Sequence, residues 1–238
     1  MFMKSESSKG MTKARLAIIL SRLPAFEGAK EGLEQYPTDS EVAAGVLWEA
    51  AMKGDVQGKR VVDLGSGPGV LGLGCLLLGA GHAVFVEKDA HALEQAKNSF
   101  SKMESEGLFT NREGETGIGE RAGERGKEKG RLADFVQGEM AIYKGAADVV
   151  VMNPPFGTRK AHADREFLEK AMQIAPLIYS FHKSETLPFL RGFAARKGFL
   201  ITHEWLFDFP LKASMAHHRR RIHRIAACCI RLEKQQGI

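Results

Sequence analysis

A rigid turn rich in hydrogen-bond acceptors follows one predicted strand. The β-branched run Val149–Val151 predicts a buried strand, and Asn153-Pro154-Pro155-Phe156 follows it after a single residue. Neither proline can donate a backbone hydrogen bond, so the strand must end there. The Asn153 side-chain oxygen and the Pro154 carbonyl are both acceptors. Pro155 stiffens the turn, and Phe156 offers a ring on which a splayed-out base can stack.

This combination suits the transfer of a group to a planar amine. Two acceptors that face one conjugated NH₂ group pull its nitrogen toward sp³ geometry and expose its lone pair to an electrophile. A strong base is unnecessary because the product can lose its proton after transfer. We therefore predict that Asn153 and Pro154 hold an exocyclic amine. The alternative interpretation is a β-turn that has only a structural role.

A glycine-rich loop forms the second candidate site. In VVDLGSGPGV (61–70), glycines let the backbone approach a ligand closely, and the following helix offers free N–H groups. A dinucleotide fingerprint needs glycine where this chain has Val70. Glu87, about 20 residues beyond the loop, suits ribose hydroxyls. Asp63 could meet an ammonium group and would repel a pyrophosphate, which favours S-adenosylmethionine as the ligand. A glycine turn used only for tight packing is the alternative.

Alternating strands and helices must position these groups. Residues 59–80 predict a strand, a glycine turn and a helix. Further strands are predicted at 82–89, 132–139, 147–153, 177–181, 199–207 and 222–233, and further helices at 13–23, 37–55, 90–100, 165–175 and 185–198. The alternation predicts an α/β fold with a doubly wound, mainly parallel seven-stranded sheet in a single domain. The last two strands follow one another directly and predict an antiparallel hairpin at one edge.

Two segments are predicted to lie outside the packed domain. Residues 1–12 are predicted to form a flexible N-terminal extension of a domain at 13–238. In residues 101–131, glycine alternates with balanced Glu, Lys and Arg, and large apolar side chains nearly vanish. Such a segment cannot bury enough surface to offset its ordering entropy, so we predict a flexible insertion at 101–131.

Composition limits the cellular setting. No apolar run approaches the roughly 18 residues that a membrane span needs, and the N-terminus lacks a secretory h-region. We expect a cytoplasmic protein, or a nuclear one in a eukaryote. Cys75, Cys228 and Cys229 lack metal-ligand spacing, so we predict core cysteines and no metal site. Much of the net charge of +5 lies in 208–224, and such a basic cluster favours a polyanionic partner.

Several motifs together resemble one methyltransferase family. The pattern D-x-G-x-G-x-G at 63–69, followed by an acidic strand end, resembles class I S-adenosylmethionine-dependent methyltransferases, which have a Rossmann-like sheet. Asn-Pro-Pro-Phe resembles the signature of enzymes that methylate amino groups conjugated to a π system. Four further stretches carry the resemblance: LEQYPT (33–38), HADREFLEKA (162–171), YSFHKSE (179–185) and FDFPLKASMAHHRRR (207–221). The chain is similar to the methyltransferase-like protein 5 family and its archaeal relatives from about 16 to 233, apart from the insertion.

The resemblance implies an activity, partners and a set of site residues. It implies N6-methylation of one adenosine in small-subunit ribosomal RNA, the target adenine being held at the Asn-Pro-Pro-Phe turn. It also implies, for eukaryotic members, a small zinc-binding activator protein that covers a surface near the third strand. S-adenosylmethionine, which leaves as S-adenosylhomocysteine, would be held by Gln35, Tyr36, Thr38, Asp63, Gly65, Ser66, Gly67, Glu87, Glu139 and Asn153. RNA would be contacted by His182 and Lys183, and we add Lys212, Arg219, Arg220 and Arg221 as phosphate contacts. For His182, a satisfied histidine at a strand end is the alternative.

Three other functions are alternatives. A glutamine-amide protein methyltransferase shares Asn-Pro-Pro-aromatic, but usually carries Tyr at the fourth position and an additional N-terminal helical domain. A DNA adenine-N6 methyltransferase shares the motif too, although no added target-recognition domain is evident. A non-catalytic RNA-binding assembly factor would have no need for Asp63, Glu87 and Asn153 together.

Overall fold

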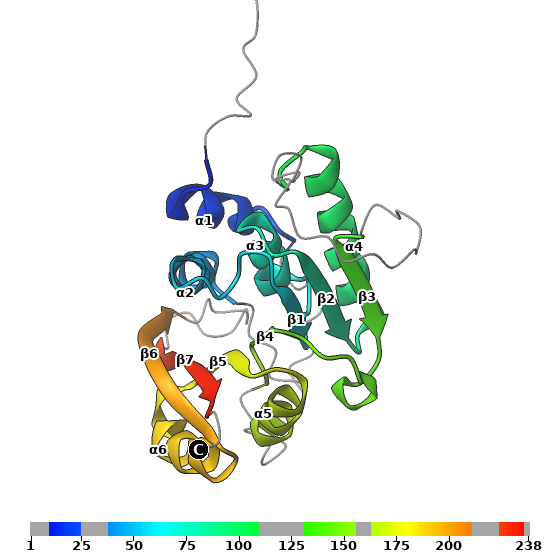
Figure 1. Cartoon of the computed structure of the whole chain (residues 1–238). Helices are drawn as coiled ribbons and strands as arrows, with labels where there is room; N and C mark the ends of the chain where they lie inside the picture. The colour runs from blue at the N-terminus through cyan, green and yellow to red at the C-terminus, as the bar shows by residue number, and fades with distance from the viewer. Residues whose placement is uncertain (1–9, 25–37, 110–130, 156–162, 211–223, 236–238) are drawn as a thin grey trace, which may run out of the picture.

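A seven-stranded sheet with helices on both faces forms the protein (Figure 1). The computed structural model describes residues 10–24, 38–109, 131–155, 163–210 and 224–235. The strands are β1 (Arg60–Leu64), β2 (His82–Glu87), β3 (Ala133–Gln137), β4 (Val149–Met152), β5 (Leu177–Lys183), β6 (Phe199–Pro210) and β7 (Arg224–Lys234). The α-helices are α1 (Lys13–Ser21), α2 (Ser40–Met52), α3 (Val70–Leu77), α4 (Ala90–Ser105), α5 (Ala163–Ile174) and α6 (Leu187–Arg196).

The strand order confirms the predicted doubly wound sheet. It runs β3-β2-β1-β4-β5-β7-β6. β1 to β5 pair in parallel, and β7 is antiparallel to both β5 and β6, which confirms the edge hairpin. The order changes direction at β1, which lies between β2 and β4. Open α/β sheets bind ligands beyond the carboxyl ends of the strands at such a point.

Two apolar layers hold the helices against the sheet. α1 to α4 cover one face through side chains such as Leu47, Leu73 and Phe100. α5 and α6 cover the other face through Leu168 and Phe193. Because both faces are covered, all four residues of β4 are buried, and the strand is a continuous apolar run without polar alternation.

Local signals set the starts of two helices. Asp39 is the N-cap of α2, and its Oδ1 accepts the N–H groups of Glu41 and Val42 at 2.9 and 3.1 Å. Pro188 lies in the first turn of α6, where a missing N–H breaks no helical hydrogen bond. The predicted helix at 185–198 therefore tolerates its proline.

The structure corrects the predicted start of the insertion. α4 continues to Ser105, and Met103 and Phe109 are buried. The Phe109 ring stacks on Phe100 with 5.2 Å between centroids. Composition averaged over 101–131 concealed these apolar side chains, which extend the apolar stripe of the helix. Residues 110–130 lie outside the described part of the chain.

The predicted N-terminal extension is also too long. Thr12 caps α1, because its hydroxyl accepts the Arg15 N–H at 3.2 Å. Met11 packs against the apolar layer that contains α1 and α2. The folded domain therefore includes Met11 and Thr12, and residues 1–9 lie outside the described residues.

A buried polar cluster joins the loop before β1 to β5 and β7. The Arg231 guanidinium donates to Asp55 through Nε at 2.8 Å and Nη2 at 3.3 Å. The Tyr179 hydroxyl donates to Asp55 Oδ2 at 2.5 Å. Arg231 also donates to Thr202 Oγ1 and Glu233 Oε2, each at 2.7 Å. Buried charges require such partners, so this cluster fixes the loop to the antiparallel end of the sheet.

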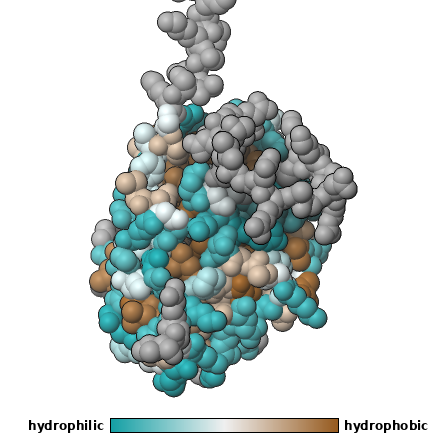
Figure 2. Space-filling view, in the orientation of Figure 1, coloured by the Kyte–Doolittle hydropathy of each residue, from teal (hydrophilic) through white to brown (hydrophobic). Residues whose placement is uncertain are grey.

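The visible surface is mainly hydrophilic, with separate apolar spots (Figure 2). Among the residues that the structure describes, no helix is long and apolar enough to cross a membrane. The same residues contain no group of three or more His, Cys, Asp or Glu side chains arranged for a metal ion. Cys75, Cys228 and Cys229 are all buried, as predicted for core cysteines.

Candidate active site

Two predicted features meet at one edge of the sheet. They are the acceptor turn, which is the Asn-Pro-Pro-Phe sequence at 153–156, and the glycine loop at 65–69. β1 pairs with β2 on one side and with β4 on the other, so the carboxyl ends of all three strands lie together (Figure 1). In the register of the sheet, Asp63 of β1 pairs with Phe85 of β2 on one side and with Val151 of β4 on the other. The loop after β1, Glu87 at the end of β2 and Asn153 after β4 are therefore neighbours in space.

The loop between β1 and α3 requires glycine for its backbone shape. Gly65, Gly67 and Gly69 have φ values of +73°, +52° and +88°, a region that other residues rarely adopt. A Cβ on Gly65 would also lie 2.8 Å from the Phe167 ring. Phe167, on the first turns of α5, thus stands against the loop, a contact that sequence reasoning missed. The order of elements could have indicated this contact. α5 follows the acceptor turn in the chain, so its first turns must lie near the carboxyl ends of the strands.

Glu87 ties the glycine loop to β2. Its Oε2 accepts the Gly67 N–H at 2.8 Å, and its Oε1 accepts the Asp89 N–H at 2.9 Å. The side chain is buried at the end of the strand. Each carboxylate oxygen retains a second lone pair for a ligand hydroxyl. The predicted ribose contact is compatible with this geometry, and Glu87 shapes the loop as well.

Asp63 is buried and forms a hydrogen bond to the first turn of α3. Its Oδ2 accepts the Gly72 N–H at 2.7 Å, and the residue is only 1% exposed. The N-cap residue Gly69 has no side chain, so Asp63 satisfies an N–H group of the first turn instead. Burial raises the pKa of Asp63 to about 8, the Gly72 N–H opposes this rise, and the negative charge of Glu87 adds to it.

The raised pKa of Asp63 predicts a stability change with pH. The pKa of Asp63 is about 8 in the folded protein and 3.8 in the unfolded chain, so folding favours the protonated form. This contribution to stability is complete below the unfolded pKa, and it is lost progressively as pH rises from there through the folded pKa. Asp63→Asn keeps an acceptor for Gly72 and removes the charge. We expect the free energy of unfolding of the variant, relative to wild type, to rise by roughly 1–3 kcal/mol between pH 5 and pH 9. Urea unfolding at both pH values measures this, and a constant difference would contradict it.

Asn153 is held by a residue far away in the sequence. Its Nδ2 donates to Thr38 Oγ1 at 3.0 Å. Pro154 is buried and Pro155 is partly exposed, so the turn is packed as well as stiff. Thr38, predicted to contact the cofactor, thus lies against the acceptor turn. Phe156, Gln35 and Tyr36 lie outside the described residues.

Comparison with known proteins identifies the family. The family described as conserved hypothetical protein 95 matches residues 31–188. A Drosophila melanogaster protein, named rRNA N(6)-adenosine-methyltransferase Mettl5, is 32% identical over 87% of this chain and 89% of its own length. The chain belongs to the methyltransferase-like protein 5 family. A Pyrococcus horikoshii protein provisionally described as an RNA methyltransferase has a crystal structure with a TM-score of 0.77 at 34% identity, covering 95% of this chain and 100% of that one.

A more distant structure supports the fold alone. The magnesium protoporphyrin IX methyltransferase of Synechocystis, solved with bound SAM, has a TM-score of 0.57 at 13% identity, covering 82% of this chain and 79% of that one. This chain therefore has the class I methyltransferase fold that was predicted for it.

The site of this family member has a free polar group suited to a cofactor. Ser66 Oγ is buried in the glycine loop and has no hydrogen-bond partner among the described residues. A buried hydroxyl usually has a partner, so its place in the loop fits a polar ligand. Glu139, another predicted cofactor contact, is not buried as Ser66 is. Its side chain is 70% exposed, and its Oε1 lies 3.8 Å from Lys88 Nζ. It remains available to a ligand at the edge of the site.

The structure corrects the role predicted for His182. The residue is 1% exposed, and its Nε2 lies 2.6 Å from Ser180 Oγ. Burial lowers the pKa of His182 to about 3, so the ring is neutral and cannot attract phosphate. Its burial and its Ser180 partner support the alternative of a satisfied histidine at a strand end. Lys183 lies near Glu185 at 3.8 Å and stays a candidate RNA contact.

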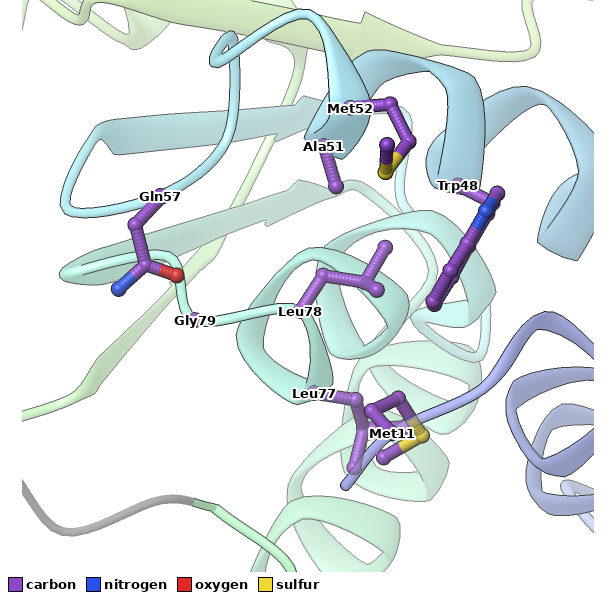
Figure 3. A pocket seen from close by; sticks show the side chains of 8 residues that line it. All are labelled: Met11, Trp48, Ala51, Met52, Gln57, Leu77, Leu78 and Gly79. Carbon is purple, nitrogen blue, oxygen red and sulfur yellow. The ribbon is translucent and has the colours of Figure 1, made fainter.

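The remaining predicted contacts are not tested by the geometry. Lys212, Arg219, Arg220 and Arg221 lie outside the described residues. A pocket of about 270 Å³ lies elsewhere, around the C-terminal end of α3 (Figure 3). Met11, Trp48, Met52 and Leu78 line it at the amino end of the strands, opposite Asn153. Its lining is mostly apolar and includes none of the predicted site residues, so it is not the candidate active site.

Proposed function

We propose that this protein methylates N6 of an adenosine in small-subunit ribosomal RNA, with S-adenosylmethionine as the methyl donor. The observation that carries the proposal is the meeting of Asn153 with the glycine loop and Glu87 at the switch point of the sheet. The names of relatives such as Mettl5 support ribosomal RNA as the substrate class.

The residues of the site have separate tasks in this proposal. Bound S-adenosylmethionine would supply an electrophilic methyl group on its sulfonium. The cofactor would be bound by the backbone of the loop from Gly65 to Gly67, by the Ser66 hydroxyl and by the Glu87 carboxylate. Asp63 keeps α3 and the loop in place, and Glu139 is the proposed contact for the adenine of the cofactor. Gln35 and Tyr36 are proposed cofactor contacts on the resemblance alone.

Asn153 and Pro154 orient the target amine. The Asn153 amide oxygen and the Pro154 carbonyl accept the two hydrogens of adenine N6, which turns the nitrogen lone pair toward the donor. No base is needed before transfer, because the N6 proton is lost to water afterwards. Phe156 is proposed to stack on the adenine. Lys183, Lys212 and Arg219 to Arg221 are proposed to contact RNA phosphates.

A protein partner is proposed at the β3 edge. Among the described residues, β3 pairs only with β2 and no strand pairs with its outer edge, which fits the strand addition proposed here. The proposed partner is a small zinc-binding activator like the one that the resemblance implies for eukaryotic members.

Labelled methyl transfer tests the proposed function. Purified protein is incubated with labelled S-adenosylmethionine and small-subunit RNA, with and without ribosomal proteins, and nucleosides are identified by mass spectrometry. We expect N6-methyladenosine in small-subunit RNA and none in large-subunit RNA. Methylated glutamine in a ribosomal protein, or methylated adenine only in DNA, would overturn the proposal in favour of those substrates.

Glu87→Ala is expected to weaken S-adenosylhomocysteine binding by about 10- to 100-fold. The partly buried N–H groups of Gly67 and Asp89 lose their acceptor, and each such loss costs on the order of 1 kcal/mol. Titration calorimetry measures the dissociation constant. Glu94→Ala, on the exposed face of α4, is the control and should bind as wild type does. Unchanged affinity of Glu87→Ala would contradict the loop-shaping role.

A further inference from the structure

One hydrogen bond links the acceptor turn to the start of α2. The Asn153 side chain follows β4, and Thr38 lies immediately before the N-cap of α2, 115 residues earlier. Asn153 Nδ2 donates to Thr38 Oγ1 at 3.0 Å, and the pair is partly buried. This distance is that of a well-formed hydrogen bond.

Both ends of this hydrogen bond are anchored. Asp39 caps α2 with two hydrogen bonds, and α2 buries Ala43 and Leu47 against its neighbours. β4 is fully buried between β1 and β5, and Pro154 after it is buried as well. The bond therefore joins two rigid parts of the domain.

We propose that Thr38 is a positioning residue that holds the Asn153 side chain in place for the reaction. The amide can rotate about two side-chain bonds, and its hydrogen bond to Thr38 Oγ1 restricts both rotations. The Oδ1 atom lies on the other arm of the planar amide, so the same bond keeps the proposed acceptor of adenine N6 at one place. The inference rests on the proposed function and gives Thr38 a role other than cofactor contact.

The two roles of Thr38 predict different kinetics. Thr38→Val removes the hydroxyl and nearly preserves the shape. As a positioning residue, Thr38 should affect kcat, with a loss of roughly tenfold, as expected when one hydrogen bond is lost. The dissociation constant of S-adenosylhomocysteine should change less than about twofold. Thr38→Ser should recover most of the rate, because it restores the oxygen.

A double-variant cycle separates positioning from a general structural effect. In the Asn153→Ala background there is no amide to orient, so Thr38→Val should cause no further loss of rate. Ser40→Ala, two residues away on the first turn of α2, is the matched control and should keep the wild-type rate. Additive losses, or a loss of cofactor affinity with kcat unchanged, would overturn the inference.

A measurement without RNA distinguishes failure of this inference from failure of the proposed function. The side-chain amide resonances of Asn153 in ¹⁵N-labelled protein are identified by their disappearance in Asn153→Ala. They should move in Thr38→Val and stay near the wild-type position in Thr38→Ser. Unchanged resonances in Thr38→Val overturn the inference even if RNA is methylated. Moved resonances together with no methylation by wild type overturn the proposed function alone.

Discussion

Asn153→Ala is expected to lower the rate of methyl transfer to small-subunit RNA by about 100- to 1,000-fold. The variant removes one of two acceptors that orient the amine, and loss of one preorganised hydrogen-bonding group at a reaction centre typically has an effect of this size. The backbone carbonyl of Pro154 remains, so some rate remains too. The side chain lies at a strand end, and the glycine loop is held by Glu87, so folding and cofactor binding should persist.

Single-turnover rates with saturating cofactor and RNA measure this effect, because they exclude product release. The S-adenosylhomocysteine dissociation constant of Asn153→Ala should stay within about twofold of wild type. Asn153→Asp keeps an acceptor oxygen, and the Thr38 hydroxyl can donate to it, so its rate should lie between wild type and Asn153→Ala. A rate of Asn153→Ala within threefold of wild type would show that Asn153 does not hold the amine.

Asp55→Ala is expected to reduce the free energy of unfolding by about 3–5 kcal/mol. The buried guanidinium of Arg231 would lose its main charged partner, and the Tyr179 hydroxyl would lose its acceptor. Removing one member of a buried ion pair leaves an uncompensated charge, which has an effect of this magnitude. Urea unfolding followed by circular dichroism at pH 7 measures it.

Two companion variants show whether burial is the cause. Glu233 also accepts from Arg231, but its side chain is 54% exposed, so Glu233→Gln should change stability by at most about 1 kcal/mol. The double variant Asp55→Leu/Arg231→Met removes both charges and should be more stable than Asp55→Ala. A loss below 1 kcal/mol in Asp55→Ala would mean that water reaches Arg231 and satisfies it.

Patterns within short stretches of sequence predicted most of the fold. The Val149–Val151 run, the glycines of the loop and the two prolines after Asn153 each restrict the backbone locally, so their elements are found as predicted. Alternation of strand and helix indicated a parallel sheet, and in such a sheet the carboxyl ends of strands lie together. The place of the candidate site followed from those local rules and from the resemblance.

Only the tertiary structure decided which polar groups are partners. Asn153 and Thr38 are 115 residues apart, and Asp55 and Arg231 are 176 apart, so no local pattern indicates these bonds. The same holds for burial: His182 is neutral because the folded domain buries it, which strand periodicity within β5 could not reveal. A hydrogen-bond partner or a pKa depends on neighbours brought together by packing of distant segments. The sequence by itself determined the elements and the chemistry at their ends, and packing determined the orientation, charge and exposure of each group.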